Sequence, residues 1–147
     1  MTTTEDDKVF VDTNVLLAAT DTSREKHAEA ITFLDEGLKG EIRLFVISQI
    51  FREYMVVATR PVEVNGLGLP LLDAVENVRK FKSFIQMLPD DDETAQELLS
   101  LISKHDLKGK RIHDANLVAS MARHGLRMLK TFNPDDFEVF AERIVMA

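Results

Sequence analysis

The chain has 147 residues, a length typical of one domain rather than two. Hydrophobic residues make up 45% of it and charged residues 29%, which is the composition of a globular protein and not of a disordered one. The 18 lysines and arginines against 25 aspartates and glutamates give a net charge of -7, which excludes a protein that coats nucleic acid by charge alone.

The chain contains no cysteine, which excludes a disulfide framework, a thiolate zinc site and a cysteine nucleophile. The longest apolar runs, at residues 9–11 and 44–47, are far shorter than the roughly 20 residues that a membrane span requires, and residues 1–8 are polar and acidic. We therefore expect a cytoplasmic protein with no membrane segment and no export signal.

The first half of the chain predicts a strand followed by helix. Residues 9–11 are continuously apolar, as in a strand buried on both faces, and residues 15–19 begin a helical stretch. Residues 24–39 have the spacing of an amphipathic helix, which Gly40 ends. The apolar face predicted for this helix consists of Ala28, Ile31, Leu34 and Leu38.

The same alternation then repeats. Residues 44–47 predict a second buried strand, and Ser48 is the expected N-cap of a helix that stops before Pro61. Residues 62–69 predict a loop, and Pro70 is expected to open a helix that extends to about residue 82.

A third strand is predicted at residues 84–88 and a helix at residues 92–105. Residues 107–111, with a glycine among three cations, predict a loop before a helix at residues 112–124. The apolar face predicted for the helix at 92–105 consists of Ala95, Leu98, Leu99 and Ile102.

The C-terminal part predicts a fourth strand at residues 127–131, a turn at 133–136 and an edge strand at 143–146. Repeated alternation of strand and helix predicts a three-layer α/β fold, in which helices cover both faces of a central parallel sheet of four to five strands. No internal repeat or linker interrupts the pattern, so we expect residues 1–147 to form a single domain.

Acidic and polar residues follow the predicted strands at the edge where parallel sheets place their sites. Asp12 comes directly after the first strand, Glu53 lies six residues after the second, and Asp114 lies near the start of its helix. The other polar residues at this edge are Thr13, Asn14, Thr131, Asn133, Asp135 and Asp136. Four segments that carry carboxylates are therefore expected to meet.

Crowded carboxylates repel one another unless a cation neutralises them, and oxygen ligands without cysteine favour magnesium or manganese over zinc. Each acid alone also has an ordinary explanation: Asp12 as a helix cap, Glu53 as a solvated surface residue and Asp114 as a partner of the helix dipole. These independent explanations would all have to fall at one sheet edge, so the set favours metal-dependent phosphodiester or phosphate chemistry.

Four segments, residues 9–17, 48–53, 113–115 and 131–137, occur in an order that resembles the PIN-domain family. Among its members, the chain resembles the VapC-type ribonuclease toxins of type II toxin-antitoxin pairs. The resemblance covers nearly the whole chain. It implies a PIN-like fold, a ribonuclease activity that uses Mg²⁺ or Mn²⁺, a small antitoxin protein as partner, and a homodimer.

Residue by residue, the resemblance implies that Asp12, Glu53 and Asp114 bind the metal ion and activate water to cut RNA. Thr13 matches the hydroxyl residue beside the first acid, and Asn14 is expected to hold the turn. The final motif departs from the family because the position two after Thr131 carries Asn133 where an acid is common. Asp136 is then the expected fourth metal ligand, and Asn133 can orient a water without contributing charge.

Cations near the acids provide the expected contacts to RNA phosphates. The set comprises Arg52, Lys108, Lys110 and Arg111, with Lys104 and Arg60 nearby. Each of them alone fits an ordinary solvated surface equally well. The nine phenylalanines and one tyrosine fall mostly at predicted core positions, so base stacking is not the expected main mode of recognition.

Three functions remain open from the sequence. The first is a metal-dependent endoribonuclease that acts as a toxin on an RNA substrate, and the second is a non-catalytic PIN-like domain that binds a partner, motivated by Asn133. The third is a receiver-like phospho-acceptor domain, which requires an acceptor aspartate directly after the third strand, where Pro89 precedes Asp90. A homodimer surface is expected at residues 61–84, which carry Leu67, Leu69, Leu71, Leu72, Val75 and Val78.

Overall fold

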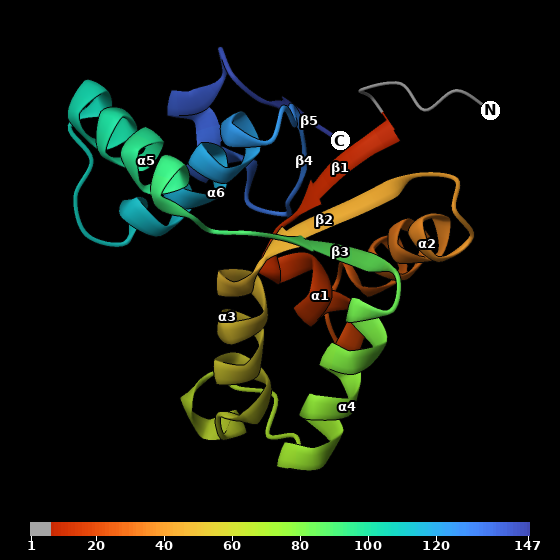
Figure 1. The fold of residues 1–147 in the computed structure, drawn as a ribbon. Coiled ribbons are helices and arrows are strands. Elements are labelled where there is room, and N and C mark those ends of the chain that lie inside the picture. Colours follow the sequence, from red (N-terminus) through yellow and green to blue (C-terminus); the bar gives the residue numbers. More distant parts are fainter. Residues whose placement is uncertain (1–6) are drawn as a thin grey trace.

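A computed structural model describes residues 7–147, and its centre is one sheet of five parallel strands in the order β3-β2-β1-β4-β5 (Figure 1). The strands are β1 (Lys8–Val11), β2 (Arg43–Ile47), β3 (Ile85–Leu88), β4 (Met128–Lys130) and β5 (Val145–Met146). The predicted parallel α/β fold is therefore confirmed, with β5 at the edge where the sequence places it.

The helices cover both faces of this sheet because right-handed crossovers change face when the strand order reverses. The chain runs from β1 through β2 to β3 in one direction and then returns to β4 on the other side of β1. In Figure 1 the helices before β3 accordingly lie below the sheet and the two that follow it lie above. The helices are α1 (Thr13–Thr20), α2 (His27–Leu38), α3 (Ser48–Thr59), α4 (Leu71–Lys82), α5 (Asp92–His105) and α6 (Arg111–Arg123), with short 3₁₀ helices η2 (Val62–Val64) and η3 (Pro134–Phe140).

The two central strands form the middle of the core, as their continuous apolarity predicts. Phe10 and Val11 of β1 and Val46 and Ile47 of β2 are all fully buried. Helices on both sides pack against them, so both faces of these strands are removed from water. Within the described part of the chain, no helix is long and apolar enough to cross a bilayer.

The predicted apolar face of α2 is confirmed at Leu34 and wrong at its other three residues. Ala28 is exposed, and Ile31 and Leu38 are 46% and 62% exposed, while Ala30, Phe33, Leu34 and Gly37 are the buried residues. Gly37 lies on the core face and approaches β2 so closely that a Cβ there would collide with the Leu44 side chain. The spacing of large apolar residues does not reveal this core face, because the residue that comes closest to β2 is a glycine.

The start of α2 and the face of α5 also differ from prediction. The Asp21 side chain accepts hydrogen bonds from Ser23 N and Oγ, at 3.0 and 2.6 Å, which holds a turn and delays α2 to His27. In α5 the buried residues are Thr94 and Leu101, whereas Ala95 is exposed and Leu99 is 63% exposed. The buried Thr94 has its polar groups satisfied, because its N–H and hydroxyl both donate to Asp91 Oδ1 at the helix start.

Two local predictions at helix ends are corrected as well. Ser48 is the first residue of α3 and not its N-cap, which is Ile47; the Ser48 hydroxyl instead accepts a hydrogen bond from Arg52 at 3.0 Å. The turn predicted at 133–136 is the start of η3, whose Phe137 and Phe140 are buried. Burial of these two aromatic rings extends the turn into a helix.

Candidate active site

The candidate site lies at the carboxyl ends of the central strands. The chain leaves β1 toward one face of the sheet, and neighbouring β4 is reached from the other face, so the strand order reverses between them. Open parallel sheets form a crevice at such a point. Asp12 follows β1 and Thr131 follows β4 there, which places the first and last predicted segments side by side.

Asp12 is held by hydrogen bonds to both of its carboxylate oxygens. Oδ1 accepts from the Thr13 N–H at 2.7 Å, so Asp12 does cap α1, and Oδ2 accepts from the Thr131 hydroxyl at 2.9 Å. Burial nevertheless raises the pKa of Asp12 from 3.8 to about 6, and the negative charges of Glu53 and Asp136 add to that rise. The hydrogen bonds favour the charged form but do not compensate its loss of hydration.

Glu53 is fixed by two neighbours on opposite sides. Its Oε2 accepts from the Thr13 hydroxyl at 2.8 Å, and its Oε1 accepts from Gln49 Nε2 at 2.8 Å. Thr13 thus connects the two acids, because its backbone N–H binds Asp12 while its hydroxyl binds Glu53. This contact is the reason that a hydroxyl residue follows the first acid.

Asp114 is half-buried in the first turn of α6 and accepts no side-chain hydrogen bond or ion pair from residues 7–147. Burial raises its pKa from 3.8 to about 6, and the charges of Asp12, Asp136 and Glu53 contribute in that order. The structure therefore couples all four predicted acids electrostatically, although Asp136 itself is exposed at the surface of η3.

The acids of this site influence one another's pKa values without forming a close cluster of metal ligands. No three acidic or histidine side chains of the described residues converge closely enough to form a ready-made cage for a metal ion. Burial first, and the charges of neighbouring acids second, raise the pKa values of Asp12 and Asp114, so the ionised forms of both are under-stabilised without a cation. Such a pair fits Mg²⁺, which takes one or two carboxylates and retains several waters.

Asn14 connects the ends of β1 and β4. Its Nδ2 donates to the Thr131 hydroxyl at 3.1 Å, and its Oδ1 accepts from the Phe132 N–H at 3.0 Å, in keeping with the expected role of holding the turn. Asn133 is exposed, and its backbone N–H donates to the Thr131 hydroxyl at 3.1 Å. Its side chain makes no hydrogen bond to the residues that the structure describes.

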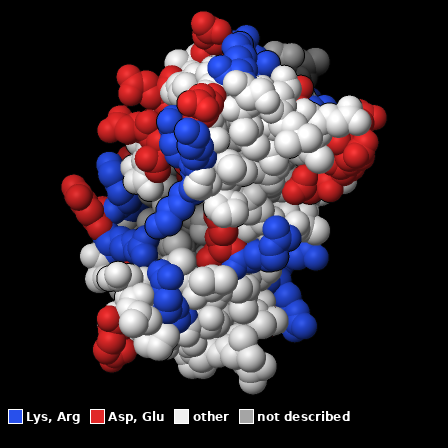
Figure 2. Space-filling model, turned by 90° about the vertical axis from the view of Figure 1, so that its left-hand side faces the viewer, with Lys and Arg blue, Asp and Glu red and all other residues white. Residues whose placement is uncertain are grey.

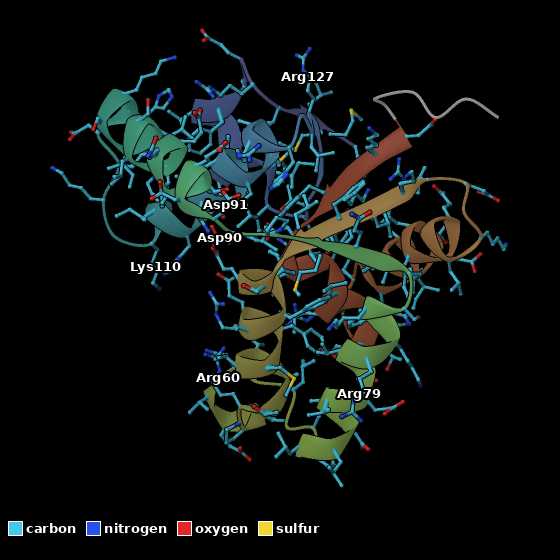
Figure 3. All side chains as sticks on the ribbon, viewed as in Figure 1. Arg60, Arg79, Asp90, Asp91, Lys110 and Arg127 are labelled. Atoms are coloured by element: carbon cyan, nitrogen blue, oxygen red, sulfur yellow. The ribbon has the colours of Figure 1, made fainter. Side chains whose placement is uncertain are left out.

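The four cations predicted to contact RNA are all exposed: Arg52, Lys108, Lys110 and Arg111. Figure 2 shows acidic atoms recessed on this face, with lysine and arginine atoms on either side of them. Lys110 lies in the left half of Figure 3, on the side that Figure 2 presents to the viewer. Basic side chains are therefore present beside acidic ones on this face, although the whole chain is acidic.

Two residues at the site were missed by the sequence reasoning. Gln49 is buried beside Glu53, and Asn116 Nδ2 donates to Gln49 Oε1 at 2.8 Å. The spacing of Gln49, one turn before Glu53 on the same helix, was a signal that could have identified it. Asn116 gave no such signal, because 67 residues separate it from its partner.

Comparison with solved structures finds the same fold in toxin proteins. VapC20 from Mycobacterium tuberculosis, a sarcin-ricin loop cleaving toxin, has a TM-score of 0.67 and 16% identity over 93% of this chain and 96% of that chain. A toxin-antitoxin complex from Klebsiella pneumoniae has a TM-score of 0.60 and 21% identity over 88% and 90%. VapBC2 from Rickettsia felis, bound to a DNA fragment from its promoter, has a TM-score of 0.66 and 10% identity over 95% and 97%.

Sequence comparison with curated proteins finds no match. The family model of the PIN domain, however, matches residues 9–143, which contain every acid discussed above. The resemblance drawn from the four motifs is thereby confirmed, and the chain belongs to the PIN-domain family.

Proposed function

We propose that this protein is a metal-dependent endoribonuclease that hydrolyses RNA phosphodiester bonds and acts as the toxin of a type II toxin-antitoxin pair. The observation that carries the proposal is the pair Asp12 and Asp114, two carboxylates from elements far apart in the sequence. Burial of each side chain is the largest cause that raises its pKa to about 6. Membership of the PIN-domain family and the fold of VapC toxins support the same function.

Some residues of the proposed site would bind the metal ion, and others hold these ligands in place. Asp12 and Asp114 would bind Mg²⁺ or Mn²⁺, and Glu53 and Asp136 would be the third and fourth acids of the metal site. A bound divalent ion activates water and stabilises the negative charge that develops in phosphoryl transfer. Thr13 and Thr131 keep Asp12 in place, and Asn14 keeps Thr131 in place, so these three residues support the acids.

The proposed substrate is RNA, which the exposed cations Arg52, Lys108, Lys110 and Arg111 would meet through its phosphates. One structural neighbour is described as a toxin that cleaves the sarcin-ricin loop, which supports RNA as the substrate class. Other neighbours are toxin-antitoxin complexes, which supports a small antitoxin protein as partner.

We also propose a homodimer. Leu67, Leu69 and Val78 are partly buried against the core, so they contribute less to an interface than expected. Other apolar residues of α3, η2 and α4 are strongly exposed, and such a group favours a protein contact. They are Val56, Val62, Val64, Leu71 and Leu72, each more than half exposed.

A non-catalytic, partner-binding PIN-like domain is the second candidate. The observation in its favour is Asn133, which contributes no charge where an acid is common in the family. The two candidates differ in their need for the acids: catalysis requires Asp12, Glu53 and Asp114, whereas partner binding does not.

An RNA cleavage assay with Mg²⁺, with Mn²⁺ and with a chelator tests the proposal. Asp12→Asn, Glu53→Gln and Asp114→Asn should each lower cleavage at least about tenfold, or roughly 1.4 kcal/mol in the barrier. Glu142→Gln, which removes an exposed charge from the C-terminal turn, should cleave as the unmodified protein does. Cleavage that survives the chelator, or persists in Asp12→Asn, would refute the metal-nuclease mechanism and favour the second candidate.

A further inference from the structure

We propose that Gln49 is a positioning residue for the nuclease reaction: its amide holds the Glu53 carboxylate, and Asn116 sets the direction in which that amide points. The inference rests on the proposed function, because it assigns Glu53 a part in catalysis. It adds a second set of residues to the site, neither of them acidic.

Gln49 is placed to act directly on Glu53. It is 6% exposed, and its Nε2 donates to Glu53 Oε1 at 2.8 Å across one turn of α3. Glutamine is mostly exposed in proteins, so a buried one needs hydrogen-bond partners for its amide. Glu53 has only one other donor, the Thr13 hydroxyl, among the residues described. Without Gln49, one of its two oxygens would lose its restraint.

The direction of the Gln49 amide follows from its surroundings. Its Nε2 faces two groups that can only accept, the Glu53 carboxylate and the His113 carbonyl oxygen, the latter at 3.3 Å. Its Oε1 faces the Asn116 amide, whose Nδ2 donates to it at 2.8 Å. A reversed amide would set an oxygen against both acceptors and a nitrogen against a donor, so this pattern of partners selects one orientation.

Asn116 is itself oriented by a carboxylate. Its Nδ2 also lies 3.4 Å from Asp90 Oδ2, and a carboxylate only accepts. Figure 3 labels Asp90 where the chain passes from β3 to α5. The relay from Asp90 through Asn116 and Gln49 to Glu53 therefore joins three separate elements.

This relay also ties the two acid-bearing helices together. Gln49 and Glu53 lie on α3, while Asn116 and the His113 carbonyl lie on α6, on either side of Asp114. Both contacts of Gln49 with α6 thus flank the acid that the site requires. Gln49 therefore fixes where the Glu53 carboxylate stands relative to Asp114.

The first test separates positioning from general damage to the fold. Gln49→Leu keeps a similar volume but removes the donor, and it should lower kcat for RNA about tenfold with KM changed less than about twofold. In a double-mutant cycle, Gln49→Leu should not lower kcat further once Glu53→Gln is present, because the effects of residues that act through one another are not additive. Losses of kcat that add in the double variant, or an unchanged kcat in Gln49→Leu, would overturn the inference.

Asn116→Leu provides a second variant that leaves Gln49 and Glu53 in place. It should lower kcat in the same direction but by less than Gln49→Leu, because the Gln49 Oε1 loses its donor while Nε2 keeps both of its acceptors. The matched control is Gln96→Leu, since Gln96 also donates to an acid one turn away, Asp92, at 3.0 Å, but on an exposed face of α5. It should leave kcat unchanged, whereas a loss equal to that of Gln49→Leu would overturn the inference.

A readout that does not depend on cleavage uses the metal-free protein. The NMR signals of the Gln49 side-chain NH₂ should move in Glu53→Gln and in Asn116→Leu, and should not move in Gln96→Leu. Static Gln49 signals in both site variants would refute the relay even in an active enzyme. Conversely, if the unmodified protein cleaves no RNA but these signals move, the proposed function fails while the relay stands.

Discussion

Asp12 carries a charge that the metal-free fold tolerates poorly, and removing that charge should stabilise the protein at neutral pH. The rise of its pKa from 3.8 to about 6 corresponds to roughly 3 kcal/mol between the protonated and ionised forms. Since the folded state binds this proton more tightly than the unfolded state, the contribution of Asp12 to stability is greatest below pH 4 and falls as pH rises toward about 6. Between pH 4.5 and 7.5 the loss due to Asp12 is about 2 kcal/mol.

Asp12→Asn removes this loss but disturbs the hydrogen bonds. The new amide nitrogen would face Asn14 Nδ2, another donor, which lies 3.4 Å from Asp12 Oδ2 in the unmodified protein. A disturbed hydrogen bond of this kind costs about 1 kcal/mol. The net expectation at pH 7.5 is a gain of about 1 to 2 kcal/mol in the free energy of unfolding, which shrinks or reverses at pH 4.5.

Urea denaturation with chelator present, from pH 4.5 to 7.5, measures this difference for Asp12→Asn and the unmodified protein. Glu142→Gln serves as the control, because it removes the same charge from an exposed position. If the curves of Asp12→Asn and the unmodified protein remain parallel over the whole range, folding does not raise the pKa of Asp12 and the reasoning is refuted.

Three further predictions concern packing, assembly and RNA binding. Gly37→Ala should destabilise the protein by about 1 to 3 kcal/mol, measured by urea denaturation, because the added Cβ collides with Leu44; an equally stable variant would contradict the packing of α2 on β2. Leu72→Glu, at a residue that is 79% exposed, should convert the proposed dimer to a monomer in light scattering, and an unchanged mass would place the interface elsewhere. Lys110→Ala with Arg111→Ala should weaken RNA binding and reduce its salt dependence by about two counterions; an unchanged salt slope would exclude both from phosphate contact.

The sequence by itself determined the order of the elements and the identity of the acids. A continuous apolar run such as residues 9–11 is typical of a strand buried on both faces, so its strand and the position of Asp12 after it could be predicted. The helix at 92–105 has a capping acid at its start, and the structure has the same bounds. These features depend on residues near one another in the chain, and local periodicity and capping therefore encode them.

The tertiary structure decided which faces are buried and which side chains meet. The core face of α2 depends on how closely Gly37 approaches Leu44, a contact between two elements that no spacing within α2 reveals. The raised pKa values of Asp12 and Asp114 likewise depend on burial and on charges from other elements. The contact of Gln49 with Asn116, across 67 residues, exists only after α3 and α6 have packed on the sheet. Hydration, hydrogen bonding and electrostatic repulsion act through space, so only the folded chain fixes their partners.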